Sequence, residues 1–244
     1  MCKISIITVT YNSADLLRNT ITSVFEQTYE DYEYIIIDGG STDETKSIVT
    51  PFLYQISKFI SEPDKGIYNA MNKGIALAKG DYCMFLNAGD VLYDCDTLSQ
   101  IVNSFSQKNV DIYIGDAIYF KEGEIGEYFA PQLEKMPFRF CHQAMLFRTE
   151  LLKNNMYNEE YRLSGDSELL YRLIEKGVNL ESLHFPLVRE LVGEGATERN
   201  LMTSTRELYS IPYVKRNMPA YRIAFNKTKI TMYCLLKRLS LIRR

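Results

Sequence analysis

The sequence has no closely spaced pair of cysteines. Its five cysteines are widely separated and none belongs to a C-x-x-C motif: Cys2, Cys83, Cys95, Cys141 and Cys234. Closely spaced cysteines supply zinc knuckles and the disulfide frameworks of small secreted domains, so neither is supported here. Cys83 falls in an apolar segment and is predicted to be a small core residue. Thiols that stay reduced fit the cytoplasm.

Long hydrophobic runs are also missing. No window reaches the ~18 uninterrupted apolar residues that a membrane-spanning helix requires. The chain opens directly on the apolar segment KISIITVT and not on a basic-then-apolar leader. We therefore expect a cytoplasmic protein, with any membrane contact peripheral and on the inner face.

Acidic residues are absent from the end of the chain. From Lys215 to Arg244 there are nine Lys or Arg and no Asp or Glu, so the rest carries 19 basic against 31 acidic residues, a net of −12 that brings the whole to −3. An acidic body lacks the basic footprint that phosphate backbones require, which excludes nucleic acid as the main partner. The basic end is predicted to be attracted to an anionic surface.

What is present is an alternation of strand and helix patterns in a chain long enough for one full core. Apolar, β-branched runs predict strands at Ile4–Val9, Tyr34–Ile37, Lys58–Ile60, Tyr82–Leu86 and Val110–Ile114. Between them, apolar residues recur at three- and four-residue steps from Asp15 and from Ile67, and Ser41–Asp43 offers N-caps for a further helix. Strands alternating with helices predict an α/β fold with a doubly wound, mostly parallel sheet.

The pattern changes after Gly115. Two short strands joined by a polar turn predict a β-hairpin over residues 117–120 and 127–130. Further strands are expected at Cys141–Arg148 and Leu180–Pro186, and helices at Ser167–Ile174 and Arg199–Tyr209. A boundary near residue 212 divides a body, 1–212, from a basic, amphipathic helical extension, 213–244.

Two acidic residues follow predicted strands. Asp38 precedes Gly39 and Gly40, and Asp90 ends the segment Asn87-Ala88-Gly89-Asp90. Either acid alone is explained as a turn residue. Two such strand ends at one edge of a doubly wound sheet, however, favour a nucleotide and its divalent metal, Mg²⁺ or Mn²⁺.

Five segments together resemble the family-2 glycosyltransferases, which have the nucleotide-sugar-binding GT-A fold. They are SIITVTYN (5–12), IIIDGGSTD (35–43), SEPDKGIYNAMNKGIALAKGDYCMFLNAGD (61–90), HQAMLFR (142–148) and SGDSELLYRL (164–173). The resemblance spans most of residues 1–200. It implies a sugar transferred from a nucleotide-diphosphate donor, with UDP favoured and GDP and dTDP open.

The resemblance also implies roles for residues at matching positions. Asp38 would bind the base, and the other candidate nucleotide contacts are Thr8, Thr10, Tyr11, Asp64, Asn72 and Asn87. Asp90 matches the metal-binding acid of the DxD-type motif. The candidate acceptor or diphosphate contacts are His142, Gln143, and Gly195 and Thr197 of the segment GEGAT. His184, in an apolar run, is expected at the core or an edge.

The sequence departs from the family at its acid pairs. Asp38 is followed by glycine, and the DxD-type site keeps one carboxylate, Asp90. A single protein carboxylate implies weaker metal binding, completed by donor phosphates. Asn87 can add an amide oxygen.

The resemblance implies that Asp166 is the catalytic base. An acceptor hydroxyl must lose its proton as it attacks, and a partly buried carboxylate can take it. The same position, after Ser164 and Gly165, also suits a helix N-cap. Glu168 is the weaker candidate for the base.

The sequence thus predicts an inverting glycosyltransferase acting on a glycan or lipid-linked glycan in bacterial capsule, O-antigen or exopolysaccharide synthesis. The basic extension fits either an anionic membrane or packing on protein. The alternatives are a degenerate nucleotide-sugar-binding subunit and a sugar-1-phosphate nucleotidyltransferase, although no Gly-rich basic loop follows the first strand. No G-x-G-x-x-G follows it either, which disfavours a Rossmann dehydrogenase, and a glycosidase would leave the nucleotide-type residues unexplained.

Overall fold

The computed structural model describes residues 3–105, 109–120, 126–133, 138–192 and 200–238. Its strands are β1 (Ile4–Thr10), β2 (Tyr32–Asp38), β3 (Lys58–Ser61), β4 (Tyr82–Phe85), β5 (Val91–Leu92), β6 (Ile112–Phe120), β7 (Glu127–Phe129), β8 (Met145–Arg148) and β9 (Leu180–Leu191). Its helices are α1 (Ala14–Phe25), α2 (Thr45–Val49), α3 (Ile67–Leu77), α4 (Thr97–Asn103), α5 (Thr149–Asn154), α6 (Gly165–Glu175), α8 (Leu201–Leu208), α9 (Pro212–Asn217) and α10 (Ala220–Arg238), with 3₁₀ turns η1 (Thr50–Phe52) and η2 (His142–Ala144).

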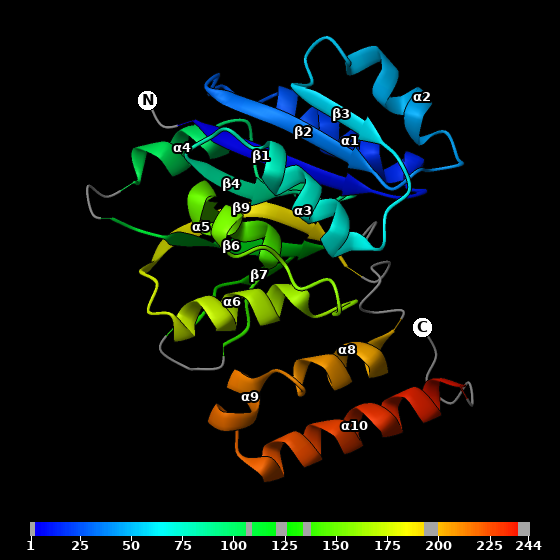
Figure 1. Ribbon diagram of the computed structural model, residues 1–244, viewed down its shortest axis with the longest axis vertical. Helices are drawn as coiled ribbons and strands as arrows, with labels where there is room; N and C mark the ends of the chain where they lie inside the picture. Colours follow the sequence, from blue (N-terminus) through cyan, green and yellow to red (C-terminus); the bar gives the residue numbers. More distant parts are fainter. Residues whose placement is uncertain (1–2, 106–108, 121–125, 134–137, 193–199, 239–244) are drawn as a thin grey trace.

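These strands form one sheet in the order β3-β2-β1-β4-β8-β6-β9-β5, with β7 paired to β6. The strands β3, β2, β1 and β4 run parallel, as the alternating pattern predicts. β8 is antiparallel to both of its neighbours, and β6 and β9 are parallel to each other. The carboxyl ends of β1, β2, β4 and β6 and the amino end of β8 therefore meet at one edge of the sheet (Figure 1).

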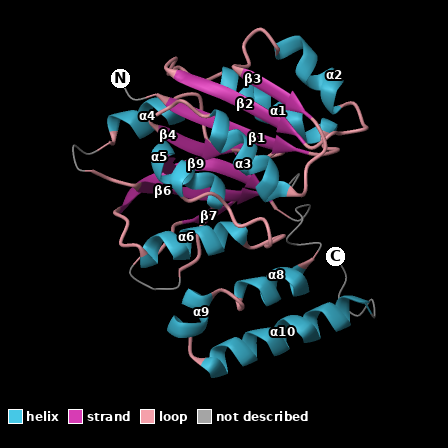
Figure 2. Ribbon diagram, in the orientation of Figure 1, coloured by secondary structure: helices cyan, strands magenta, loops and turns pink. Residues whose placement is uncertain are grey.

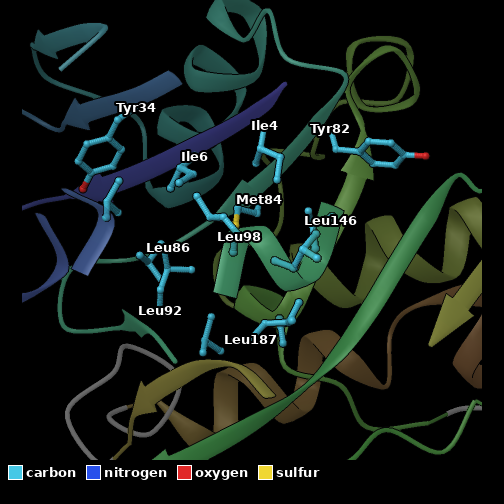
Figure 3. Close-up of a cluster of buried hydrophobic side chains, with 14 of the residues drawn as sticks. Ile4, Ile6, Tyr34, Tyr82, Met84, Leu86, Leu92, Leu98, Leu146 and Leu187 are labelled. Atoms are coloured by element: carbon cyan, nitrogen blue, oxygen red, sulfur yellow. The ribbon is translucent and has the colours of Figure 1, made fainter. Parts of the chain in front are cut away.

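Helices cover both faces of the sheet (Figure 2). Side chains of α1, α2 and α4 pack with one set of strand residues, and side chains of α3, α5 and α6 pack with the other. This explains why β1 is buried at every position, as expected of a strand covered on both faces. Figure 3 shows the first cluster, where Ile6, Met84 and Leu146 from three neighbouring strands face the same interior.

Several predicted elements have different bounds in the structure. The predicted strand at 110–114 and the first strand of the hairpin form one strand, β6, with β7 antiparallel to it. The strand predicted from Cys141 begins only at Met145, because residues 142–144 form a 3₁₀ turn. β9 continues past Pro186 to Leu191, and its register with β6 shifts beside this proline, which is where a residue without an N–H is tolerated.

The C-terminal helices extend away from the sheet below α6 (Figure 1). Tyr171 of α6 packs with Tyr209, Ile211 and Val214, and its ring stacks on that of Tyr213, with centroids 5.0 Å apart. α10 contacts α8 and not the sheet. Among the described helices, none is long and apolar enough to cross a bilayer.

Candidate active site

Hydrogen bonds at the turn after β2 connect the carboxyl ends of β1, β2 and β3. The carboxylate of Asp38 is fully buried and accepts hydrogen bonds from the backbone N–H of Ser41, 3.1 and 3.2 Å from its two oxygens, and from the hydroxyls of Ser41 and Ser61. The hydroxyl of Ser41 in turn accepts from the backbone N–H of Asn12, at 2.8 Å. Gly40 has a φ of +81°, which favours glycine. Asp38 therefore holds the turn from inside, and its direct contact with a nucleotide stays a prediction.

Three predicted residues meet on the outer side of this turn. A Cβ atom on Gly39 would lie 2.3 Å from Oδ2 of Asp64 and 3.4 Å from the ring of Tyr11, so only glycine allows this approach. The ring of Tyr11 is 61% exposed. Oδ1 of Asp64 accepts from the N–H of Gly66, at 2.8 Å, which leaves Oδ2 facing the turn. An exposed ring and a carboxylate side by side suit a planar base with N–H donors.

The threonines of β1 occupy different environments. The hydroxyl of Thr8 is buried, donates to the carbonyl of Leu86 at 2.7 Å and lies 2.9 Å from the hydroxyl of Tyr34. Thr8 is thus part of the core packing. Thr10 Oγ1 and Asn87 Oδ1, at the ends of β1 and β4, are buried without a hydrogen-bond partner among the described residues. Buried polar atoms are normally paired, so these two are available to a ligand at this edge.

Asn72 has a different set of partners. Its amide nitrogen donates to the carbonyl of Tyr157 and to Glu159, both at 3.0 Å, and its amide oxygen accepts from the N–H of Tyr157 at 2.9 Å. These bonds clamp α3 to the loop before α6. They use both ends of the carboxamide, so the predicted nucleotide contact of Asn72 competes with a structural role.

Asp90 lies at the end of the Asn-Ala-Gly-Asp turn, where Gly89 has a φ of +104°. Its carboxylate is 5% exposed and accepts from the N–H of Leu191 and from the amide nitrogen of Gln143, both at 3.0 Å. The structure thus brings Gln143 and Asp90, two of the predicted site residues, into contact.

The divalent metal that the family resemblance implies needs oxygen ligands at this edge of the sheet. No group of three or more His, Cys, Asp or Glu in the described segments could hold an ion. Asp90 and the unpaired Oδ1 of Asn87 are nevertheless hard oxygen donors at one turn. They fit an ion such as Mg²⁺, which keeps waters and substrate phosphates as most of its ligands.

Asp166 lies in the first turn of α6, whose N-cap is Ser164, so the N-cap alternative for Asp166 is wrong. Its Oδ1 accepts from the hydroxyl of Tyr68, at 3.3 Å. Burial raises the pKa of Asp166 to about 6. A carboxylate with this pKa can hold a proton near neutral pH, which suits a general base. Glu168, by contrast, pairs with Arg172 at 2.8 Å.

A chain of contacts links Asp166 to the Asp90 side. The ring of Tyr68 stacks on that of Tyr157, with centroids 5.3 Å apart, and the hydroxyl of Tyr157 lies 2.5 Å from Nε2 of His142. Burial lowers the pKa of His142 to about 4, so this histidine is neutral at physiological pH. Its neighbour Gln143 bonds to Asp90. His142 is therefore a buried link between the two acids.

Sequence patterns did not single out Tyr68 or Tyr157. Tyr68 is part of the recurring apolar pattern of α3, and Tyr157 lies in a loop, so only their proximity in space identifies them. Gly165 depends on the same packing, since a Cβ there would lie 2.7 Å from the ring of Tyr68. Gly195 and Thr197 fall outside the described residues. His184 is exposed within β9, with a φ of +54°, and its Nδ1 lies 3.3 Å from the hydroxyl of Ser182.

Comparison with known proteins identifies the family of the chain. A family model described as glycosyl transferase family 2 matches residues 5–167. Because this segment is more than half of the chain, the protein belongs to that family, and the resemblance read from the sequence is confirmed. The predicted enzyme class, a glycosyltransferase, is that of the family.

Individual relatives agree with this assignment. The PGL/p-HBAD biosynthesis glycosyltransferase of Mycobacterium bovis (strain BCG / Pasteur 1173P2) is 35% identical over 173 residues, which cover 66% of this chain and 66% of that relative. The matched part is thus slightly less than two thirds of the relative's length.

Solved structures share the fold. TarS 1-349 of S. aureus in complex with UDP-GlcNAc has a TM-score of 0.69 and 19% identity, covering 86% of this chain and 64% of that one. The mannosyltransferase PcManGT from Pyrobaculum calidifontis, in complex with GDP-Man and Mn²⁺, has a TM-score of 0.65 and 18% identity, covering 85% and 64%. The predicted GT-A fold class is confirmed.

Proposed function

We propose that this protein is an inverting glycosyltransferase that moves a sugar from a nucleotide-diphosphate donor to an acceptor hydroxyl. The observation that carries the proposal is the chain of contacts from Asp90 through Gln143, His142, Tyr157 and Tyr68 to Asp166. These contacts connect Asp90, the proposed metal ligand, to Asp166, the proposed general base. The membership of the chain in glycosyl transferase family 2 supports the same conclusion.

The nucleotide would lie against Tyr11, Gly39 and Asp64. The exposed ring of Tyr11 offers a face for stacking, and Asp64 offers an acceptor for the N–H of a base. The unpaired hydroxyl of Thr10 would contact the ribose or a phosphate, and the unpaired amide oxygen of Asn87 would accept from a ribose hydroxyl or bind the metal. A UDP-sugar is the donor we propose, with TarS bound to UDP-GlcNAc as support and PcManGT bound to GDP-Man as the alternative.

Asp90 and Asn87 would hold a divalent ion, Mn²⁺ or Mg²⁺, together with the donor phosphates. Such an ion supplies charge neutralisation at the departing diphosphate. The hydrogen bonds from Gln143 and Leu191 fix the orientation of the Asp90 carboxylate for this role.

Asp166 would act as the general base. The acceptor hydroxyl gives its proton to the Asp166 carboxylate while its oxygen forms a bond to the anomeric carbon. The bond from that carbon to the diphosphate oxygen breaks, and the nucleoside diphosphate leaves with the electron pair from the opposite face. The anomeric configuration therefore inverts. Above a pH of about 6 the carboxylate is ionised and ready to accept the proton.

The acceptor we propose is a glycan or lipid-linked glycan in the synthesis of a bacterial capsule, O-antigen or exopolysaccharide. One relative is a glycosyltransferase named for PGL/p-HBAD biosynthesis, which supports a role for this protein in a biosynthetic pathway. Work on such an acceptor would take place on the cytoplasmic side, with the protein in peripheral contact with the membrane.

A degenerate nucleotide-sugar-binding subunit is the second candidate, because the metal-type turn keeps only one acid. A panel of labelled nucleotide sugars, tested for transfer and hydrolysis with and without Mn²⁺, separates the two. Turnover of one donor supports the enzyme. Tight nucleotide binding without turnover of any donor would support the subunit.

Asp166→Asn gives the sharper test of mechanism. We expect turnover to fall by about 10²–10⁴-fold, the usual contribution of a general base, with nucleotide affinity unchanged. Glu168→Gln is the matched control two residues along α6, on a different face of the helix, and it should retain most of the activity because Glu168 pairs with Arg172. Near-normal turnover in Asp166→Asn would remove Asp166 from this role.

A further inference from the structure

Helix α10 has a face that packs against the body of the protein. Ile223, Asn226 and Ile230, spaced by three and four residues, are each partly buried. The amide nitrogen of Asn226 donates to the hydroxyl of Tyr209 at 2.8 Å, and Ile223 packs against the cluster that contains Tyr209. α10 is thus held along α8, on the side of α8 away from the sheet (Figure 1).

The opposite face of α10 carries large apolar side chains in solvent. Tyr221, Phe225 and Met232 are 74%, 67% and 56% exposed. They are four and seven residues apart, about one and two helical turns, so they form one stripe roughly half a turn from the packing face. A helix that already has a buried face on the body does not need this second stripe for folding.

Positively charged side chains lie beside the stripe. Arg222 and Lys229 are exposed on α10, one next to Tyr221 and the other one turn beyond Phe225. From Lys215 to the end of the chain there are nine cations and no acid. The rest of the sequence is net negative, so the excess of positive charge belongs to the C-terminal part of the sequence. Aromatic and apolar side chains flanked by Lys and Arg are typical of helices that lie in a membrane interface.

We propose that the stripe of Tyr221, Phe225 and Met232 docks on an anionic membrane surface while the opposite face of α10 stays on α8. A second copy of this chain fits the stripe poorly, because a two-fold contact would bring the exposed cations beside the stripe, Arg222 and Lys229, close to those of the other copy. Anionic lipid supplies the opposite charge and an apolar layer together. This proposal specifies anionic lipid as the partner in the peripheral membrane contact of the proposed function. It rests on the proposed function only for the identity of the acceptor.

Vesicle co-sedimentation of the full chain, without any sugar donor, tests the proposal. We expect binding to vesicles that contain phosphatidylglycerol, weaker binding in high salt, and little binding to phosphatidylcholine alone. The triple variant Tyr221→Ser/Phe225→Ser/Met232→Ser should lose about tenfold or more in affinity, because three apolar anchors are removed. Leu53→Ser/Tyr54→Ser is the matched control, since these side chains are 47% and 82% exposed elsewhere, and it should bind like the wild type.

Each variant is first checked for an unchanged thermal unfolding midpoint without nucleotide, which reports a folded body. Wild-type protein that ignores both kinds of vesicle, or a folded triple variant that binds as tightly as the wild type, would overturn the proposal. A dimer in light scattering that the triple variant dissociates would assign the stripe to a second copy instead. Because no donor is present, failure here leaves the transfer activity to be judged by its own assay.

Discussion

Tyr68 reaches Asp166 from a different helix, and its hydroxyl donates to Oδ1 across 3.3 Å. The negative charge of Glu207 on α8 adds to the effect of burial and raises the pKa of Asp166. Burial raises the pKa of Tyr157 and Tyr171, and the charge of Asp166 adds to that rise. Burial dominates and sets the pKa of Asp166 at about 6. A base must be ionised to accept a proton, so transfer should fall as the pH drops through this value.

Tyr68→Phe removes the donor and keeps the ring against Gly165 and Tyr157. The lost hydrogen bond stabilised the ionised form of Asp166, so the pKa of this carboxyl should rise. We expect the acidic limb of kcat/KM to move up by about 0.5–1 pH unit, with kcat at high pH reduced less than tenfold. Tyr157→Phe is the comparison for this shift, because the hydroxyl of Tyr157 bonds to His142 and not to Asp166. An unshifted limb in Tyr68→Phe would mean that Tyr68 only packs.

At the scale of elements, the turn between β2 and α2 separates two acids that look alike in the sequence. Asp38 is fully buried and bonded to Ser41 and Ser61, whereas Asp64 lies on the outer side of Gly39. The hydrophobic pattern places both after strands. It does not tell which one faces inward, because that depends on where β3 and its following loop pack.

Asp38→Asn should lower the free energy of unfolding by about 1–3 kcal/mol, since it disturbs a buried, fully bonded carboxylate. Asp64→Asn should leave stability nearly unchanged and weaken nucleotide binding by about tenfold, a loss of one charge-assisted hydrogen bond. Denaturant titration and nucleotide calorimetry on both variants measure the two effects. If Asp38→Asn instead weakened nucleotide binding and Asp64→Asn lowered stability, Asp38 would be the residue that contacts the base.

The other helix and strand ends were predicted to different degrees. The strands and helices that were predicted in the first half lie where their periodicity indicates, because amphipathic patterns report which face is buried. The short strand β5 and helix α4 were not predicted. The turn at residues 142–144 and the extension of β9 past Pro186 were not predicted. Both depend on a neighbouring strand: Gln143 turns toward Asp90, and β6 accommodates the irregular register of β9.

At the scale of the whole molecule, the partly buried Asp166 and the buried His142 make stability depend on pH with opposite signs. The pKa of Asp166 is raised from 3.8 to about 6 in the folded protein, so its contribution is present below pH 4 and is lost as the pH rises through 6. The pKa of His142 is lowered from 6.5 to about 4, so its contribution is present above 6.5 and is lost as the pH falls toward 4. The two effects oppose each other over the same range.

Asp166→Asn should separate these effects. Relative to the wild type, its free energy of unfolding should rise by on the order of 2 kcal/mol between pH 4 and pH 7, a figure reduced for the partial exposure of the residue. His142→Gln should show the opposite slope. Urea titrations at several pH values measure the difference in free energy of unfolding between each variant and the wild type. The contributions of the other carboxylates are the same in both proteins and cancel in this difference. Parallel curves for the wild type and Asp166→Asn would show that Asp166 is not held in a low-polarity site.

The amino-acid sequence by itself determined the α/β class, the alternating elements, the basic C-terminal end and the candidate acids, because periodicity, charge and motif are local properties of a chain. Tertiary structure alone decided that Asp38 faces the interior, that Tyr68 meets Asp166 across 98 positions of sequence, and that α10 keeps an apolar stripe in solvent. These outcomes depend on which surfaces pack together. Such packing joins segments that are distant in the sequence, so no local pattern reports it.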